Sequence, residues 1–179
     1  TGNLSQFMSK VQESIVTGDI EGAIAACDKQ KGSVANPIRS ALLKYQEVKR
    51  EGLDSEAAAE TIHKEIEEVT SLEMPMLEKH MTIISTLVSL GTLAGLLGTV
   101  TGMIKAFSAL SAAGSPDSAA LANGISEALI NTATGISTSA LAIVVYNFFT
   151  SKIDDLTYSI DEAGNTIVNT YRHFRSSSK

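Results

Sequence analysis

Two stretches of 24 residues without a charged side chain constrain this chain more than any other feature. They cover residues 81–104 and 128–151. A helix rises 1.5 Å per residue, so about 20 apolar helical residues cross the hydrocarbon core of a bilayer. Two such windows would overfill the core of a small soluble domain. The sequence therefore predicts an all-α integral membrane helical hairpin, whose long helices extend into a helical bundle outside the bilayer.

The charged residues gather outside these two windows. Residues 1–80 hold nine of the fourteen Lys and Arg residues and fourteen of the twenty Asp and Glu residues, whereas residues 81–151 hold one lysine and two acids. The net charge of −6 gives no reason to expect nucleic acid as a partner. Cys27 is the only cysteine, so no intrachain disulfide can form, and we expect a buried free thiol.

The basic residues indicate the orientation of the hairpin. Residues 106–126 contain no Lys or Arg, whereas Lys79 precedes the first window and four basic residues follow the second. The positive-inside rule then places the turn outside the cell and both charged parts in the cytoplasm. We expect a cytoplasmic helical domain over 1–80, membrane helices over 81–113 and 118–151, an outward-facing turn over 114–117, and a cytoplasmic C-terminal helix over 152–179.

Capping signals divide the first part of the chain into short helices. Gly18 should end the first helix, and Asp19 should cap the second. Asn36 followed by Pro37 is the pattern of a cap before the first helical position, and Gly52 should end the helix that begins there. These signals predict three short helices before residue 53.

A much longer helical pattern follows. Asp54 should cap a helix that has no clear stop from Ser55 to Gly114, although Pro75 should kink it. Gly114 and Pro116 should form the turn to the second membrane helix. Apolar residues recur at threes and fours on both helices outside the membrane windows, which predicts a bundle core. They are Ile62, Ile66, Val69 and Leu72 on one helix and Ile153, Leu156, Ile160, Ala163, Ile167, Tyr171 and Phe174 on the other.

Four glycines occupy one face of the first membrane helix. Each glycine costs about 1 kcal/mol relative to alanine in a helix interior, so an ordinary buried helix would avoid them. At spacings of four, three and four they let another helix backbone approach closely, as small residues do in bilayers. We therefore expect helix packing along Gly91, Gly95, Gly98 and Gly102.

The second membrane helix is more polar than anchoring requires. Asn131, Thr134 and Thr138 form one row, and Thr132, Gly135 and Ser139 form the neighbouring row. Hydroxyl bonds to carbonyls of the same helix would explain two or three of these residues. The full set of six residues on two adjoining rows instead favours a surface that faces water or another helix. With the turn centred between residues 114 and 115, Thr99 and Thr132 should lie at nearly the same depth.

Glu127 is the sharper functional candidate. An ionisable side chain inside a membrane span is costly and marks a functional site by default. The alternative is a carboxylate near the outer interface that is merely paired with Lys105, which the hairpin places at a similar depth. A single carboxylate provides no relay of titratable groups, so either a partner supplies an acid or the route runs through water.

At these residues the sequence resembles a known family. "GLLGTVTGM" (95–103) and "GISEALINTATGISTSALAIVVYNFF" (124–149) resemble the second and third transmembrane helices of the ExbB, TolQ and MotA proton-channel family, and are most similar to ExbB and TolQ. "VTGDIEGAIAACDKQKGSVANPIRSAL" (16–42) resembles the cytoplasmic segment after that family's first transmembrane helix. That first helix has no counterpart here, so we expect a longer protein.

The resemblance implies a function and a set of partners. It implies a homopentameric channel in the bacterial inner membrane, around a dimer of ExbD- or TolR-like single-span subunits with a membrane aspartate. Such a channel passes proton-motive force to a TonB- or TolA-like transducer across the periplasm. Thr99, Glu127 and Thr132 match family positions tied to the proton route. With Asn131, Thr134 and Ser139 they form the predicted pore lining.

Other function classes stay open. Part of the same sequence pattern is compatible with three other classes of protein. They are a structural membrane scaffold, a MotA-like or gliding-type motor stator, and a soluble helical adaptor. Because the lining is rich in hydroxyls and the first span contains Lys105, the sequence does not decide whether the transported ion is a proton or sodium. An enzyme is not expected, because the sequence contains no nucleophile, metal-ligand or phosphate-loop spacing. We accordingly expect no catalytic residues, no metal and no cofactor.

Overall fold

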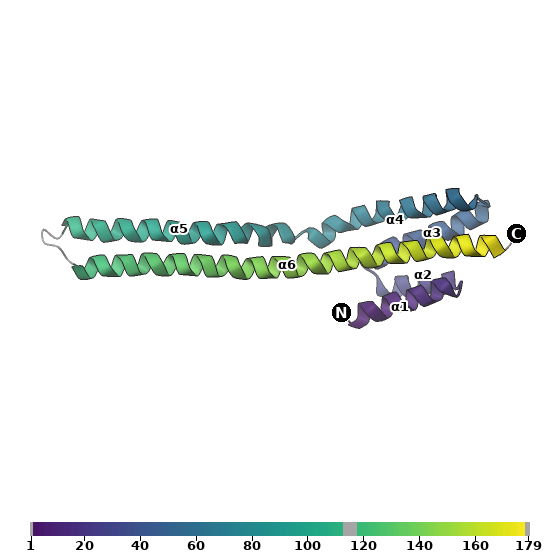
Figure 1. Ribbon diagram of the computed structural model, residues 1–179, viewed down its shortest axis with the longest axis horizontal. Helices are drawn as coiled ribbons and strands as arrows, with labels where there is room; N and C mark the ends of the chain where they lie inside the picture. The colour runs from purple at the N-terminus through teal and green to yellow at the C-terminus, as the bar shows by residue number, and fades with distance from the viewer. Residues whose placement is uncertain (1, 113–117, 178–179) are drawn as a thin grey trace. The chain divides into compact units, whose positions relative to one another are not determined.

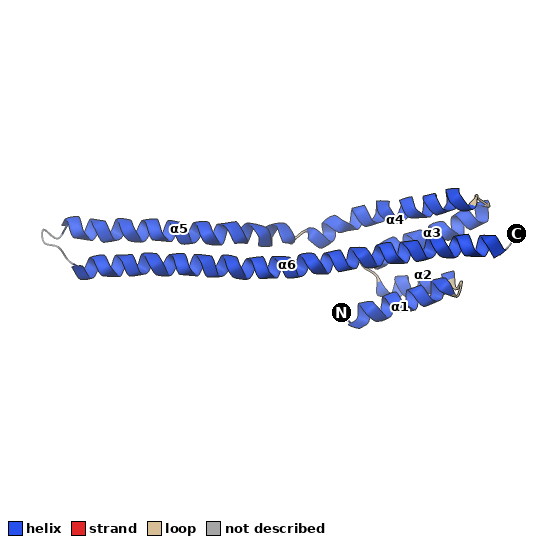
Figure 2. Cartoon of the chain, viewed as in Figure 1, coloured by secondary structure: helices blue, strands red, loops and turns tan. Residues whose placement is uncertain are grey.

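The computed structural model describes residues 2–112 and 118–177, and over these residues the chain is helical without strands (Figures 1 and 2). The all-α prediction is therefore confirmed. The predicted turn over residues 114–117 lies outside the described residues. The helices are α1 (Gly2–Val16), α2 (Ile20–Gln30), α3 (Ala35–Glu51), α4 (Ser55–Glu78), α5 (Met81–Ala112) and α6 (Ser118–Ser177).

The chain divides into two compact units. The first, here called the bundle, comprises residues 1–79 and 152–179, and the second, here called the hairpin, comprises residues 80–151. Helix α6 is continuous and contributes its first part to the hairpin and its last part to the bundle.

The bundle has a conventional apolar core. Ile62 and Ile66 of α4 and Ile160 and Ile167 of α6 are buried, as the recurring apolar residues predict. Phe174 and Leu72 were expected in the same core, but 43% of Phe174 and 69% of Leu72 are exposed. The α4 neighbours of Leu72 are largely exposed as well, so this end of the helix buries little apolar surface. In the same unit the Tyr45 and Tyr171 rings meet edge to face with centroids 5.2 Å apart.

Three of the predicted helix termini are confirmed. Helix α1 ends at Val16, and Gly18 follows it with a φ of 81°. The Asp19 carboxylate accepts a hydrogen bond of 2.9 Å from the Gly22 N–H and so caps α2. Gly52 ends α3 in the left-handed conformation, with φ of 70°.

The prediction that Asn36 caps α3 is wrong. The helix begins at Ala35, because the Gly32 carbonyl accepts bonds of 3.0 Å from the N–H groups of both Ala35 and Asn36. The Asn36 amide is thereby free to donate a 2.7 Å bond to Glu73 of α4. Asp54 does occupy the cap position of α4, but its side chain makes no capping bond.

The long helical pattern is also interrupted where no stop was predicted. Helix α4 ends at Glu78 and α5 begins at Met81, with a turn at Lys79 and His80. Pro75 lies within α4, one turn before this interruption. Proline has no N–H to donate to the preceding turn, which weakens the last turn of the helix.

The hairpin buries little of its own apolar surface. Helices α5 and the first part of α6 are long and apolar enough to cross a membrane. Only 6% of the most apolar stretch of the first and 17% of that of the second are buried inside the chain. Large side chains such as Leu93, Leu97 and Val144 are exposed along the hairpin. This is the pattern of an all-α membrane protein, whose apolar helices face lipid or other helices.

Candidate functional site

Small residues form the contact between α5 and α6. A methyl group placed on Gly95 would lie 3.0 Å from the Cα atom of Gly135, and one placed on Gly102 would lie 3.0 Å from the Cβ atom of Ala128. Gly91 and Gly98 face α6 in the same way. We call this line of close approach the seam. All four α5 glycines therefore lie against α6 in this structure.

Two flanks of the hairpin lie on either side of the seam. The consecutive residues Gly98 and Thr99 differ by about 100° around their helix. Gly98 approaches Asn131, whereas Thr99 contacts the consecutive residue Thr132. The seam therefore passes between the 98–131 pair and the 99–132 pair. Residues that share a face with Asn131 lie on one side of the hairpin, and residues that share a face with Thr132 lie on the other.

The flank that carries Thr99 and Thr132 is held by hydroxyl contacts, and we call it the hydroxyl flank. The Thr99 and Thr132 hydroxyls are hydrogen-bonded to each other, which confirms that they lie at the same depth. Two turns along α6, the Ser139 hydroxyl lies 2.9 Å from that of Thr92 and donates a 2.7 Å bond to the Val88 carbonyl. Thr92 was missed in the sequence, although its spacing of seven from Thr99 places both on one face.

The other flank contains a groove of about 330 Å³ and is called the groove flank. The Thr134 and Thr138 hydroxyls each donate to a carbonyl of their own helix, at 2.8 and 2.9 Å. The Asn131 amide donates only a long bond of 3.4 Å to the Gly98 carbonyl. The groove is lined by Gly91, Ala94, Gly95, Gly98, Asn131, Thr134, Gly135 and Thr138.

Lys105 and Glu127 form an ion pair between the two helices of the hairpin. The Lys105 Nζ atom lies 3.4 Å from the Glu127 Oε1 atom. Lys105 follows Gly98 by seven residues and Glu127 precedes Asn131 by four, so both belong to the groove flank. The six residues predicted to line one pore are thus divided. Thr99, Thr132 and Ser139 lie on the hydroxyl flank, and Glu127, Asn131 and Thr134 lie on the groove flank.

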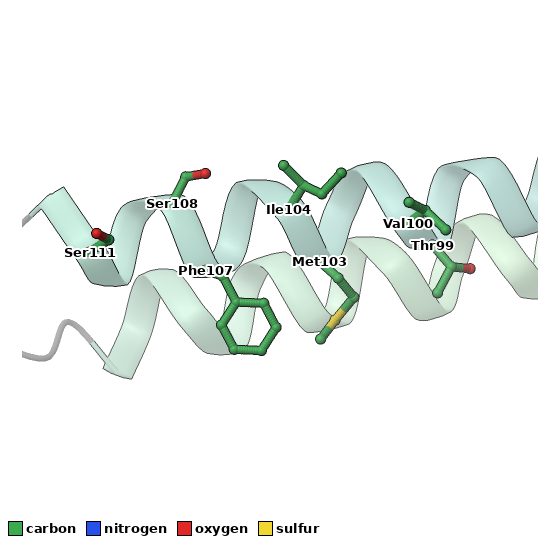
Figure 3. A pocket seen from close by; sticks show the side chains of 7 residues that line it. All are labelled: Thr99, Val100, Met103, Ile104, Phe107, Ser108 and Ser111. Atoms are coloured by element: carbon green, nitrogen blue, oxygen red, sulfur yellow. The ribbon is translucent and has the colours of Figure 1, made fainter.

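An apolar pocket of about 620 Å³ lies along α5 and was not anticipated. Figure 3 shows the seven α5 side chains that line it, with Thr99 at one end and Ser111 at the other. Four of the seven side chains are apolar, namely Val100, Met103, Ile104 and Phe107. In the sequence these residues are indistinguishable from any membrane-facing apolar run, so no signal could have identified them.

The described residues contain no cluster of three or more His, Cys, Asp or Glu side chains that could hold a metal ion. The hairpin offers instead hydroxyl, amide and carboxylate oxygens along an apolar surface. Such groups can donate and accept hydrogen bonds, so they can carry water or protons without a cofactor.

The region that matches known proteins includes the whole hairpin and extends beyond it on both sides. The sequence profile of the MotA/TolQ/ExbB proton channel family matches residues 30–162. An ExbB-like protein of Synechocystis, ExbB-like 3, is 30% identical over 146 residues, which are 80% of this chain and 70% of the relative. The Tol-Pal system protein TolQ of Pseudomonas aeruginosa is 29% identical over 136 residues, which are 72% of this chain and 59% of the relative.

A third relative matches a shorter region. The biopolymer transport protein ExbB of Xanthomonas campestris is 33% identical over 101 residues, covering 56% of this chain and 40% of the relative. The chain thus spans between 40% and 70% of the length of these three relatives.

Proposed function

Because this chain belongs to the MotA/TolQ/ExbB proton channel family, we propose that it is a subunit of an inner-membrane proton channel. The channel uses proton-motive force to drive a partner that spans the periplasm, as an ExbB- or TolQ-like energy transducer. Membership in a channel family, rather than in a family of enzymes, is consistent with a site made of hydroxyls and one carboxylate.

The hydrogen bond between Thr99 and Thr132 is the observation that carries the proposal. It lies within the region that the family profile matches and joins the two membrane helices at one depth. A pair of hydroxyls presents a polar collar without placing a charge in the bilayer. Because a hydroxyl both donates and accepts, the collar can hold water, or bind a partner's protonated carboxyl and release it after ionisation.

The proposed partners are those that the resemblance to ExbB and TolQ implies. We propose that the chain forms a ring of copies, as a homopentamer, around an ExbD- or TolR-like single-span subunit with a membrane aspartate, and that a TonB- or TolA-like transducer receives the energy. The exposed apolar surface of α5 and α6 supports assembly with further helices. We further propose that the bundle is cytoplasmic and that the turn between α5 and α6 is periplasmic.

Replacement of Thr132 tests the collar. Valine has nearly the shape of threonine but no hydrogen-bonding atom, so Thr132→Val should leave the complex assembled and abolish proton-driven work on the periplasmic partner. Thr99→Val should have a smaller effect. The matched control is Thr132→Ser, which keeps the hydroxyl and should retain most of the proton flux in liposomes. If assembled Thr132→Val complexes carry wild-type proton flux, the Thr132 hydroxyl contributes only to helix packing.

Glu127 is proposed as a second group of the ion route. Glu127→Gln should reduce partner-dependent transport while native mass spectrometry shows an unchanged complex. If Glu127 only neutralises Lys105, the double variant Glu127→Gln with Lys105→Gln should recover the lost transport. Such a recovery would remove Glu127 from the route.

A structural scaffold is the second candidate function. It is favoured by one observation, which is that Thr134, Ser137 and Thr138 all satisfy their hydroxyls on carbonyls of α6 itself. A scaffold needs no flux, so proton uptake by liposomes that contain the assembled complex separates the two functions.

A further inference from the structure

Lys105 is the most unusual residue of the hairpin. Across residues 81–112 and 118–151, which the structure describes, Lys105 and Glu127 are the two charged side chains. They are paired with each other at 3.4 Å, and 69% and 54% of their side chains are exposed within the chain. A charge inside a membrane span is costly and is retained for function. The pair therefore needs an explanation beyond anchoring of the hairpin.

The pair lies at one end of a row of oxygen atoms. Glu127, Asn131, Thr134 and Thr138 follow each other at spacings of four, three and four, so they share one face of α6. Their carboxylate, amide and hydroxyl oxygens are the ligands that hard cations prefer. By its chemistry alone, this row would suit a small metal cation such as Na⁺ as well as a proton.

The Lys105 ammonium changes that preference. It is a tethered cation that already occupies the Glu127 carboxylate, which is where an incoming Na⁺ would bind most strongly. Its charge repels every mobile cation, so the distinction between ions comes from coordination: Na⁺ needs several oxygen ligands, and the pair withholds the carboxylate from it. A proton needs no coordination shell, since it can move along hydrogen bonds between water, hydroxyls and the carboxylate.

We propose that Lys105 is a specificity-determining residue that makes the route select protons over sodium, by holding its ammonium on the Glu127 carboxylate. This inference rests on the proposed channel function. It gives Lys105 a role in ion selectivity, in addition to neutralising the charge of Glu127.

Ion selectivity in liposomes tests the role of Lys105. The whole protein is reconstituted with its single-span partner, and proton uptake is measured with sodium chloride or choline chloride outside. Wild-type flux should be the same in both salts. In Lys105→Gln, sodium should reduce proton flux about tenfold, the factor given by 1.4 kcal/mol of cation binding, and radioactive Na⁺ uptake should appear.

Two control variants test whether the effect depends on the charge of residue 105 and on its position in the hairpin. Lys105→Arg keeps the cation and should stay insensitive to sodium. Lys152→Gln removes a lysine of the bundle, which pairs with Asp155 at 3.1 Å, and should also leave the wild-type behaviour unchanged. If Lys105→Gln fails to assemble, Lys105→Met preserves the apolar stem and provides the second variant. Sodium-insensitive flux in either assembled variant would overturn the proposal.

A measurement without flux keeps the inference separate from the channel function. A ligand that binds the folded state raises its melting temperature. Sodium, compared with choline, should therefore raise the melting temperature of purified Lys105→Gln and leave that of the wild type unchanged. Equal shifts in the two proteins would refute the role of Lys105 even if the wild type conducts protons. Absence of wild-type proton flux, together with a sodium shift confined to the variant, would refute the channel function alone.

Discussion

Gly135→Ala should destabilise the hairpin although alanine is the better helix former. A methyl group at residue 135 would lie 2.6 Å from the Gly95 Cα atom and 2.7 Å from the Gly91 carbonyl oxygen. Carbon atoms in contact normally lie about 3.5–4.0 Å apart, so the two helices must separate by about 1 Å. Both obstacles belong to the α5 backbone and cannot rotate away.

The separation also breaks hydrogen bonds across the seam. The 2.9 Å contact between Thr92 and Ser139 would lengthen to about 4 Å, beyond hydrogen-bonding range. Overpacking typically costs ~1–3 kcal/mol and a lost hydrogen bond ~1 kcal/mol, against a gain of ~1 kcal/mol in helix propensity. The net loss of ~1–3 kcal/mol should lower the melting temperature by roughly 5 °C for a chain of this size. Circular dichroism of the detergent-purified protein measures it.

Gly164→Ala is the matched control in the same helix. A methyl group there would meet the Ile66 Cδ1 atom at 2.8 Å, and this terminal methyl can move aside. The gain in helix propensity should then dominate, so the melting temperature should stay unchanged or rise. If Gly135→Ala behaves like Gly164→Ala, the close approach at the seam is not what holds α5 to α6.

Two further predictions concern the bundle. Burial raises the pKa of the Cys27 thiol from 9.0 to about 11, so iodoacetamide at neutral pH should label it only after denaturation. Because the folded state favours the protonated thiol, its contribution to stability is present below pH 9 and should be lost as the pH rises towards 11; rapid labelling of the native protein would contradict this burial. Ile167→Ala, at a fully buried position, should cost ~2–5 kcal/mol of unfolding free energy in a denaturant titration. Tyr158→Ala, where 72% of the residue is exposed, should cost little, and equal losses would place Ile167 outside the core.

Strong local signals in the sequence predicted most of the fold. Local chemistry alone determines the two uncharged windows of 24 residues, the left-handed backbone conformation of Gly52 and the N-cap at Asp19. The sequence was therefore sufficient to predict them. The start of α3 at Ala35 was not predictable, because the Asn36 backbone N–H bonds to the Gly32 carbonyl while its side-chain amide donates to Glu73, which is distant in the sequence. The exposure of Leu72 was equally hidden, since periodicity identifies an apolar face but not what covers it.

The sequence predicted which candidate residues lie at the same depth, but not which side of the hairpin each one occupies. Depth along an antiparallel hairpin can be counted from the turn, which is why the Thr99–Thr132 and Lys105–Glu127 pairs were found. The division into two flanks depends on where the seam passes. A single chain gives only helical rows, and the choice between adjoining rows needs the position of the second helix.

Proton uptake by liposomes that contain the whole protein with its single-span partner tests the channel function most directly. An imposed membrane potential should acidify or alkalinise the lumen, as reported by an entrapped pH-sensitive dye, with Thr132→Val complexes of the same composition as the matched blank. We expect proton flux in the wild type and its loss in Thr132→Val. Correctly assembled wild-type complexes that carry no more protons than Thr132→Val would contradict it.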